Sequence, residues 1–497
     1  MSAPAQGHPD RDPSRTGMRR ADTAGSSAAT GFASKAVATS NPAEQTPDVV
    51  VIGGGVAGIA AALDCANAGA RVTLVEVRRR LGGAAYSFER DGMQIDNGQH
   101  VFLRCCAAYR GLLSRLGSER CVRVQERLEI PVLSPGRETV TLSRSGLPAP
   151  AHLAGTLMRY RHLTRAQRLR AIRAVSALKG VDPDDETLER QTFGQWLAEH
   201  GQDEETVAVL WELIVLATLN VPAAQASPGL AAFVFQQGLL AHADAGDVGF
   251  HERPLSETIA EPAARALEHA GVRVLLGWRA QRIQRRDAGL VVSSSGEEIA
   301  TQAVIVALPH ARAAGMMDDL APELASRVRQ IESSPIVNVH VVYDRQVCEH
   351  RFAAGVRTPV QYLFDRTAAA GIASATRGIA SGSGGVPDGC QYLAVSLSGA
   401  EQEMQMSVDQ LRERYLPAMR ELLPRARHAR VEAFFATREH AATFRASPGV
   451  ARLRPPARTP AKGLVLAGAW TDTGWPATLE GATLSGHAAA REALQVL

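Results

Sequence analysis

Lysine is almost absent from this 497-residue sequence. Of its 54 basic residues only Lys35, Lys179 and Lys462 are lysines, and the other 51 are arginines. Acidic residues nearly balance them, so the formal net charge is only +3. A net charge this small does not indicate a nucleic-acid-binding protein, and we expect no nucleic-acid partner. The arginine excess has two possible explanations. It either reflects the base composition of the genome or serves to bind phosphate and carboxylate groups, and only the positions of the side chains can distinguish the two.

Paired cysteines and long apolar runs are also missing. The six cysteines form no Cys-x-x-Cys pair and no zinc-spaced cluster with histidine, so we expect no metal site. Their scatter favours a reducing, cytoplasmic setting. No run of about 18 apolar residues occurs, and the N-terminus lacks the apolar core of a secretory signal. We therefore expect neither a membrane-spanning helix nor export.

The first 46 residues have little that could form a core. They are rich in Ala, Ser, Thr, Gly and Pro and contain one aromatic residue, Phe32. Ordering such a segment costs about 1–2 kcal/mol per residue with little burial in return. We expect residues 1–46 to be a disordered tail.

A glycine motif marks the start of the folded chain. Residues 49–52 read as a buried strand, Gly53-x-Gly55-x-x-Gly58 follows, and residues 59–68 read as a helix. A second strand then ends at Glu76, where a carboxylate can hold the two hydroxyls of a ribose. In this strand–turn–helix context, Gly53, Gly55 and Gly58 predict a loop that admits a dinucleotide pyrophosphate at a helix N-terminus.

Three further segments favour FAD over NAD. Arg80-Leu81-Gly82-Gly83 resembles the glycine doublet of the amine oxidase/phytoene desaturase flavoprotein superfamily. Residues 303–309 resemble the strand that closes the FAD domain of that superfamily, and residues 466–482 resemble its C-terminal flavin-contacting motif. The resemblance implies FAD as cofactor. The residues that it assigns to FAD, beyond the first glycine motif and Glu76, are Arg80, Gly82, Gly83, Gly468, Glu480, Gly481 and Ala482.

One branch of the superfamily is matched more specifically. Four segments together resemble the hydroxysqualene dehydroxylases, also called squalene-associated FAD-dependent desaturases. They are residues 95–103, 211–220, 334–340 and 470–482. Two positions depart from the pattern: Ala84 stands where relatives often carry Arg, and Ala469 where many carry Asp. Losing that carboxylate would remove about one hydrogen bond to FAD, worth about 0.5–1.5 kcal/mol.

The resemblance also implies an organisation. We expect an α/β protein with a discontinuous Rossmann-type FAD-binding domain and an α+β substrate domain. The FAD-binding domain is expected in three parts, at 47–110, 251–312 and 455–497. A helical, substrate- and membrane-facing region is expected at 111–250, and a substrate domain with an antiparallel sheet at 313–454. Residues 371–389, rich in Gly, Ser and Ala, read as a loop.

For function, the resemblance implies reduction of hydroxysqualene to squalene with loss of water, in hopanoid biosynthesis. The flavin carries the hydride, so a further electron donor must reduce it. Loss of the hydroxyl requires a general acid. The candidates are His100, Asp96 and Glu480, each of which could equally be a hydrogen-bonding or helix-capping residue. Alternatives are a carotenoid desaturase or an amine oxidase of the same superfamily, or a flavin-binding protein without catalysis.

An isoprenoid substrate is lipophilic and predicts two further features. Residues 144–180 contain no Asp or Glu but eight cations among apolar residues, which predicts a basic amphipathic helix. Such a helix either packs on its own domain or makes peripheral contact with anionic lipid at the inner face of the cell membrane. Residues 213–221, 233–235 and 239–240 are apolar and either form core or line a substrate tunnel.

Overall fold

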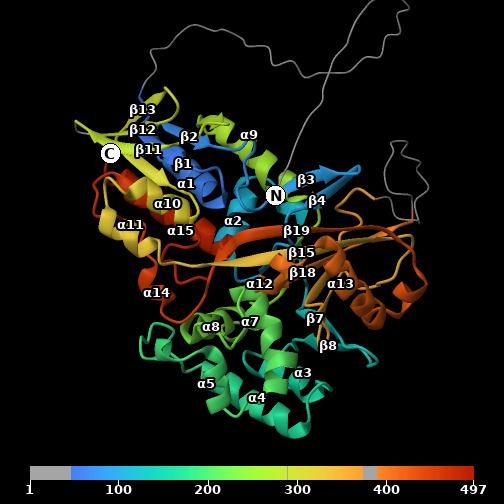
Figure 1. Cartoon of the computed structure of the whole chain (residues 1–497). Helices are drawn as coiled ribbons and strands as arrows, with labels where there is room; N and C mark the ends of the chain where they lie inside the picture. Colours follow the sequence, from blue (N-terminus) through green and yellow to red (C-terminus); the bar gives the residue numbers. More distant parts are fainter. Residues whose placement is uncertain (1–45, 288, 373–388) are drawn as a thin grey trace, which may run out of the picture. The chain divides into compact units, whose positions relative to one another are not determined.

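A computed structural model describes residues 46–287, 289–372 and 389–497. The predicted tail, up to residue 45, and most of the predicted loop at 371–389 lie outside these residues. The segment Thr46–Leu497 forms one compact unit (Figure 1).

The first sheet is parallel and is assembled from three distant stretches of chain. Its strand order is β10-β2-β1-β14-β20, and every neighbouring pair is parallel. Strands β1, β2, β14 and β20 are buried along their whole length, which explains why β1, β14 and β20 read as unbroken apolar runs. The prediction of a discontinuous α/β dinucleotide-type domain is confirmed. The strands are β1 (Val49–Ile52), β2 (Val72–Glu76), β10 (Arg273–Leu276), β14 (Ala303–Val306) and β20 (Leu464–Leu466).

The C-terminal helix returns to the first helix of the chain. Helix α1 (Val56–Asn67) packs against α15 (Leu479–Leu494) so closely that a Cβ atom on Gly486 would lie 2.4 Å from the Ala57 carbonyl oxygen. Helices α2 (Ala107–Arg115) and α9 (Glu261–His269) contact α15 and α1 respectively. This packing buries the Ala-rich faces of α1 and α15 and explains why the last motif of the sequence belongs to the first domain.

The second large sheet has seven strands, and all neighbouring pairs except β16–β7 are antiparallel, as the sequence predicts for this region. Its long strands β15 and β19 cross the middle of Figure 1. Helices α12 (Glu401–Gln405) and α13 (Val408–Leu422) contact β15 and β19. In spatial order the strands are β19 (Val431–Phe444), β15 (Ser333–Tyr343), β18 (Gln391–Ser398), β17 (Tyr362–Asp365), β16 (Phe352–Gly355), β7 (Glu129–Leu133) and β8 (Val140–Ser143).

Smaller elements complete the sheets. Strands β11 (Arg282–Arg286), β12 (Gly289–Ser293) and β13 (Glu298–Thr301) form one antiparallel sheet, and β3 (Ser87–Arg90) pairs with β4 (Met93–Asp96). A third small sheet has the order β5-β9-β6, with β5 (Val101–Leu103), β9 (Val248–His251) and β6 (Val122–Val124). Helices α10 (His310–Met317), α11 (Pro322–Val328) and α14 (Val450–Leu453) lie in the connections.

Residues 111–250, predicted to be helical, also contribute strands β6 to β9. The helical part forms a layer at the bottom of Figure 1. Two π-helical segments, Val207–Trp211 and Gln236–Leu240, interrupt it. Its α-helices are α3 (Ala154–Arg159), α4 (Arg165–Leu178), α5 (Phe193–Glu199), α6 (Glu204–Thr206), α7 (Glu212–Leu219) and α8 (Pro228–Phe235).

The prediction of one amphipathic helix over 144–180 is wrong. The segment instead contains the separate helices α3 and α4. Tyr160 ends α3, since it is fully buried and donates its hydroxyl to the Val209 carbonyl. Thr164 then begins α4 as an N-cap, with Gln167 completing a capping box.

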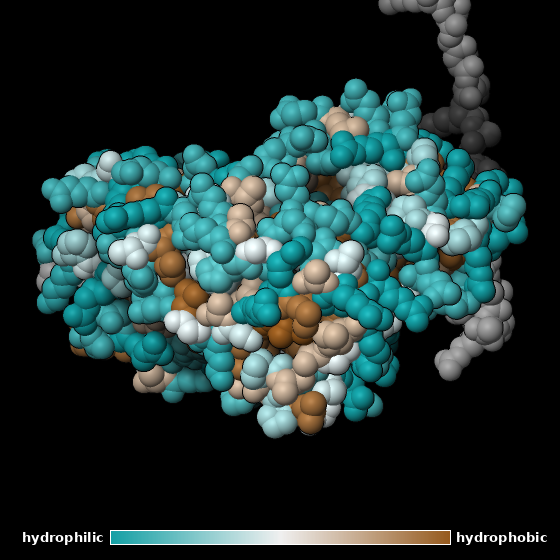
Figure 2. Space-filling model, turned by 90° about the horizontal axis from the view of Figure 1, so that it is seen from below, coloured by the Kyte–Doolittle hydropathy of each residue, from teal (hydrophilic) through white to brown (hydrophobic). Residues whose placement is uncertain are grey.

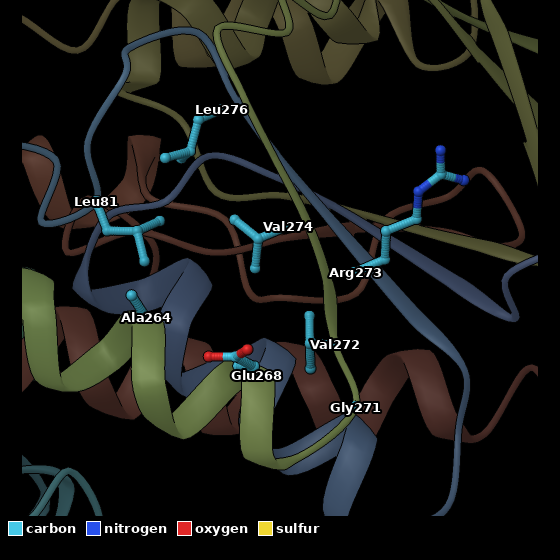
Figure 3. Close-up of a pocket in the computed structure, with 8 residues that line it drawn as sticks. All are labelled: Leu81, Ala264, Glu268, Gly271, Val272, Arg273, Val274 and Leu276. Carbon is cyan, nitrogen blue, oxygen red and sulfur yellow. The ribbon is translucent and has the colours of Figure 1, made fainter. Parts of the chain in front are cut away.

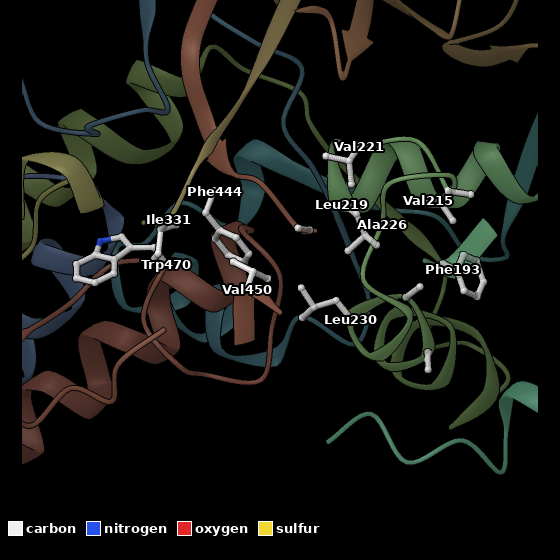
Figure 4. Close-up of a cluster of buried hydrophobic side chains, with 14 of the residues drawn as sticks. Phe193, Val215, Leu219, Val221, Ala226, Leu230, Ile331, Phe444, Val450 and Trp470 are labelled. Carbon is white, nitrogen blue, oxygen red and sulfur yellow. The ribbon is translucent and has the colours of Figure 1, made fainter. Parts of the chain in front are cut away.

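One apolar core joins the helical layer to the FAD-type domain. Figure 4 shows this cluster running from Phe193 and Leu230 through Phe444 and Val450 to Trp470. Trp470 lies four residues after the end of β20, a strand of the parallel sheet. The two regions therefore share side-chain packing and do not depend on a flexible linker.

Candidate functional site

The first glycine motif forms the turn between β1 and α1. A Cβ atom on Gly58 would lie 1.9 Å from the Gly53 carbonyl oxygen, so only glycine lets α1 approach β1 this closely. Gly55 is the N-cap of α1, and it has no side chain to satisfy the first N–H groups of the helix. These groups remain available to an anion at the N-terminus of α1.

The glycine doublet packs against this turn. The Gly82 N–H donates to the Gly54 carbonyl at 2.8 Å, and a Cβ atom on Gly83 would lie 2.7 Å from the Gly55 Cα. Backbone alone therefore lines this part of the site, where the sequence predicts the pyrophosphate of FAD. We refer to residues 53–58 with residues 82–83 as the glycine cradle.

Glu76 is fixed beside the glycine cradle by two backbone donors. Its carboxylate accepts the N–H of Gly54 at 2.7 Å and the N–H of Arg78 at 2.8 Å. The side chain is buried at the carboxyl end of β2. Each oxygen retains a lone pair for a ribose hydroxyl, as the sequence predicts.

Several buried polar side-chain atoms have no hydrogen-bond partner among the described residues. Arg80 stacks on Tyr86, with 3.7 Å from guanidinium carbon to ring centre, and one of its nitrogens donates to the Gly83 carbonyl. Its Nη2, the Gln99 Nε2 and the Asn338 Oδ1 are buried and have no hydrogen-bond partner among the described residues. Such atoms are costly to bury unless a ligand satisfies them, so the residues present fit FAD.

The C-terminal motif begins where β20 ends. The Gly468 N–H donates to the Ser485 hydroxyl on α15, and the Thr478 hydroxyl caps the same helix by accepting the Gly481 N–H. Glu480, Gly481 and Ala482 form its first turn. Ligands of open α/β sheets bind outside the carboxyl ends of the parallel strands, which is where this loop lies.

Glu480 caps a second helix. Its two carboxylate oxygens accept the N–H groups of Ala108 and Tyr109, at 3.0 and 2.7 Å, at the N-terminus of α2. The side chain is 4% exposed. Burial raises the pKa of Glu480, while the two N–H donors oppose that rise.

The other two catalytic candidates lie differently. Asp96 is buried in an ion pair with Arg366 at 2.6 Å and also accepts the Ser87 hydroxyl and the Leu255 N–H. The ring of His100 has no hydrogen bond within the described part of the chain, and burial lowers its pKa. His100 is therefore neutral at pH 7, and the arrangement around Asp96 is that of a structural ion pair.

Glu480 is one of the residues that line an apolar cavity of about 300 Å³. The predicted tunnel segments line it, through residues including Leu213, Ile214, Phe233 and Leu239. Both π-helical segments contribute, which agrees with the frequent occurrence of such segments at functional sites. Glu480 is the only Asp, Glu, Lys, Arg or His side chain among the described residues that line this cavity.

Strands of the second sheet contribute to the cavity wall through residues that the sequence did not single out. Ile130 from β7, Phe352 from β16, Tyr362 from β17 and Ser396 from β18 all line it. Their sequence segments show only ordinary strand patterns, so no local signal distinguishes them from core. Sequence reasoning also did not single out Arg454 as a site residue. In the structure its side chain is only 5% exposed.

A separate hollow of about 500 Å³ lies at the free edge of the parallel sheet, between β10 and α9 (Figure 3). None of the predicted site residues lines it. Within residues 46–287, 289–372 and 389–497, no group of three or more His, Cys, Asp or Glu side chains is placed to hold a metal ion. In the same residues no helix combines the length and apolarity needed to cross a membrane.

The parallel sheet, the glycine cradle and the returning C-terminal helix together define an FAD-dependent oxidoreductase. The chain belongs to the family of flavin-containing amine oxidoreductases, which matches residues 56–494. Its cofactor is FAD.

Curated relatives place the chain among several activities of this family. It is 28% identical to hydroxysqualene dehydroxylase of Rhodopseudomonas palustris, over 89% of this chain and 97% of that protein. It is 23% identical to zeta-carotene desaturase of Synechocystis, with 90% and 97% covered.

Solved structures agree on the fold. Putrescine oxidase bound to putrescine is 18% identical with a TM-score of 0.67, over 90% of this chain and 99% of that one. Cyclohexylamine oxidase from Brevibacterium oxydans IH-35A is 18% identical with a TM-score of 0.66, with 91% and 99% covered.

Proposed function

We propose that this protein reduces hydroxysqualene to squalene. In this reaction the C–O bond of the alcohol breaks, a C–H bond forms, and the hydroxyl leaves as water after taking up a proton. Bound reduced FAD supplies the hydride, and a separate electron donor restores the reduced state. The relatives named hydroxysqualene dehydroxylase support this choice, together with the shape and chemistry of the cavity.

The apolar cavity is the observation that carries the proposal. Its wall presents Phe, Leu, Ile, Val and Trp side chains from the helical layer and from the second sheet. Burying a hydrocarbon against such a wall is favourable by about 25 cal/mol per Å² of apolar surface. Because residues of the C-terminal flavin-contacting motif, including Trp475 and Glu480, line the cavity, an isoprenoid placed in it would lie against that motif.

We propose that Glu480 is the first candidate for the general acid. It is the one Asp, Glu, Lys, Arg or His side chain of the described cavity wall, and burial raises its pKa, which favours the protonated form that an acid needs. His100 is the second candidate, as a neutral imidazole between the cavity residues Gln99 and Val101. If Glu480 is the proton donor, Glu480→Gln should lower kcat and change the pH dependence of kcat. If His100 is the donor, His100→Gln should have these effects instead.

A carotenoid desaturase is the second candidate function. The same apolar wall suits a carotene, and a zeta-carotene desaturase is among the relatives. Amine oxidation is less well supported, because an amine is cationic at pH 7 and Glu480, the one carboxylate in the described wall, already accepts two N–H groups.

Peripheral membrane contact remains part of the proposal, with fewer cations than the sequence predicted. Of the eight in 144–180, Arg144 pairs with buried Asp247 at 2.6 Å and Arg170 pairs with Asp203. Arg161 pairs with Glu138, and Arg168 donates to backbone carbonyls. Four of the eight cations have no ion pair or hydrogen bond to the described residues: Arg159, Arg165, Arg173 and Lys179.

Apolar side chains lie among these cations. Leu147, Met158 and Leu169 are about half exposed in the same segment. Figure 2 views the molecule from the side of the helical layer and shows apolar patches interspersed with hydrophilic residues. Behind this surface, Leu153, Leu157 and Val175 line the cavity. We propose that an isoprenoid enters from lipid between α3 and α4.

Anaerobic turnover tests the function directly. The reduced holoenzyme is mixed with hydroxysqualene, and squalene and flavin absorbance are followed together. Squalene formed in equal amount to reoxidised flavin supports the proposal. Flavin that stays reduced with hydroxysqualene, while oxidised enzyme dehydrogenates zeta-carotene or an amine, overturns it.

A further inference from the structure

The loop between β20 and α15 carries most of the C-terminal motif, and it depends on a residue outside that motif. The loop leaves the parallel sheet at Gly468 and reaches α15 at Thr478. It has no regular secondary structure, so its carbonyl groups need partners from elsewhere.

Arg454 supplies those partners. It directly follows α14, and its Nη2 donates to the carbonyls of Thr471 at 2.6 Å and Trp475 at 2.7 Å. Two longer contacts, both 3.5 Å, reach the Ala469 carbonyl and the Thr473 hydroxyl. One guanidinium group therefore spans the loop from its first residues to Trp475.

The guanidinium is buried and remains charged. Its carbon lies 4.7 Å from the ring centre of Phe444, within cation–π range. Burial lowers the pKa of Arg454 to about 10, so the group is still positive at pH 7. Its Nε is buried and has no partner among the described residues. Because residue 469 is Ala and Asp472 is exposed, no buried carboxylate of this loop neutralises the charge.

The loop that Arg454 holds touches both halves of the site. The Trp470 indole N–H donates to the Leu308 carbonyl, which ties the loop to the segment after β14. Trp475 packs edge-to-face on Phe233 at 5.3 Å, and both residues line the cavity. A shift of this loop would thus disturb the cofactor site and the cavity wall together.

We propose that Arg454 is a positioning residue of the FAD site. It fixes the loop between Gly468 and Thr478, and its buried positive charge favours the two-electron-reduced, anionic flavin over the neutral oxidised flavin. The proposal rests on FAD binding alone and not on the identity of the substrate.

The test compares Arg454→Met with Arg452→Met. Arg452 lies two residues earlier in α14 and forms only an exposed ion pair with Glu186. For R454M we expect the Kd of FAD, measured by flavin fluorescence, to rise about tenfold as buried carbonyls lose a charged donor. We also expect the ratio of affinities for reduced and oxidised flavin to fall about tenfold, a potential about 30 mV more negative. R452M should change neither value.

Arg454→Lys separates charge from geometry. It should recover the potential of the wild-type protein, since the charge is kept. The Kd of FAD should stay raised, because the Lys side chain is shorter and its Nζ does not reach the position of the Arg454 Nη2, which makes all four loop contacts. An R454M protein with the Kd and potential of R452M would overturn the proposal. If R454M does not fold, R454K decides, and a Kd equal to that of R452M would overturn the positioning role. A potential in R454K that is shifted about 30 mV negative would overturn the charge effect.

Discussion

The glycine cradle and the apolar cavity are built by different means. In the cradle, main-chain atoms lie so close together that a single Cβ atom would overlap a neighbour, as at Gly58 and Gly83. The cavity wall consists of side chains from helices and strands far apart in the chain. The cradle is therefore specified by a few positions that admit one residue type, and the cavity by many positions that admit several.

The strongest test of this contrast is Gly58→Ala. Its Cβ would lie 1.9 Å from the Gly53 carbonyl oxygen, so α1 must move away from β1. We expect loss of bound FAD and a fall of about 3 kcal/mol in the free energy of unfolding. Flavin absorbance of the purified protein and denaturant unfolding measure the two effects. The control is Gly111→Ala on α2, where a Cβ would meet nothing within 4 Å. Equal FAD content in the two variants would contradict the role of the cradle.

A substitution in the cavity wall should affect turnover and not FAD binding. Ala217 lines the cavity, and Ala217→Trp fills part of it without touching the cradle. We expect kcat/KM to fall at least about a hundredfold while FAD content is unchanged, because the substrate no longer reaches the cofactor. Steady-state rates with hydroxysqualene and flavin absorbance provide the measurement. Ala224→Trp, exposed and outside the cavity wall, is the matched control and should keep its rate. Unchanged kcat/KM in A217W would show that substrate does not use this cavity.

The outer surface of the helical layer should govern access and not chemistry. Each surface cation contributes about 1 kcal/mol of attraction to anionic lipid. Removing three of them costs about 3 kcal/mol, so reversing them, in Arg159→Glu, Arg165→Glu and Arg173→Glu together, should weaken liposome binding at least about a hundredfold. Flotation with anionic vesicles measures this effect. Arg265→Glu, Arg312→Glu and Arg327→Glu, three exposed arginines outside the segment, change the net charge equally. If both triple variants float equally well, the segment is not the membrane contact.

The same contrast explains what could be predicted from sequence. The cradle depends on neighbours within a few residues, so Gly53, Gly55, Gly58 and the doublet are recognisable directly. Long-range partners are not recognisable in this way. For the segment that includes Arg144 the sequence left packing on its own domain and contact with lipid as alternatives, but the partner of Arg144, Asp247, follows 103 residues later and is fully buried. The acid-free stretch around Arg144 gave no sign of that carboxylate, because charge pairing is decided by the packing of β8 near β9 and not by local composition.

Asp96 and Glu480 show the same limit within the predicted site. Both are acidic residues in motif segments, and local sequence could not tell an acid catalyst from a structural carboxylate. Arg366 pairs with Asp96 from 270 residues away, and the N-terminus of α2 meets Glu480 from 371 residues away. Their surroundings, and for Glu480 the rise of its pKa, follow from tertiary contacts.

A final, smaller effect concerns Glu212 at the start of α7, whose role no motif announced. Burial raises its pKa to about 7, one oxygen accepts the Ala223 N–H, and the other is buried without a partner in the described structure. Between about pH 4.5 and 7 the unfolded chain loses this proton before the folded chain does, so Glu212 destabilises the fold progressively as pH rises. Glu212→Gln removes the ionisation and keeps an acceptor for Ala223.

We therefore expect E212Q to raise the free energy of unfolding by about 1–2 kcal/mol at pH 8 and to change it little at pH 4.5. Urea unfolding at the two pH values measures the difference. Glu204→Gln, on an exposed residue of α6, controls for loss of one negative charge. A stabilisation of equal size at both pH values would mean that packing, and not the ionisation of Glu212, sets its cost. Since α7 also lines the cavity, the expected stabilisation of E212Q would show that the helical layer tolerates a change of side chain, in contrast to the loss of FAD expected for Gly58→Ala in the glycine cradle.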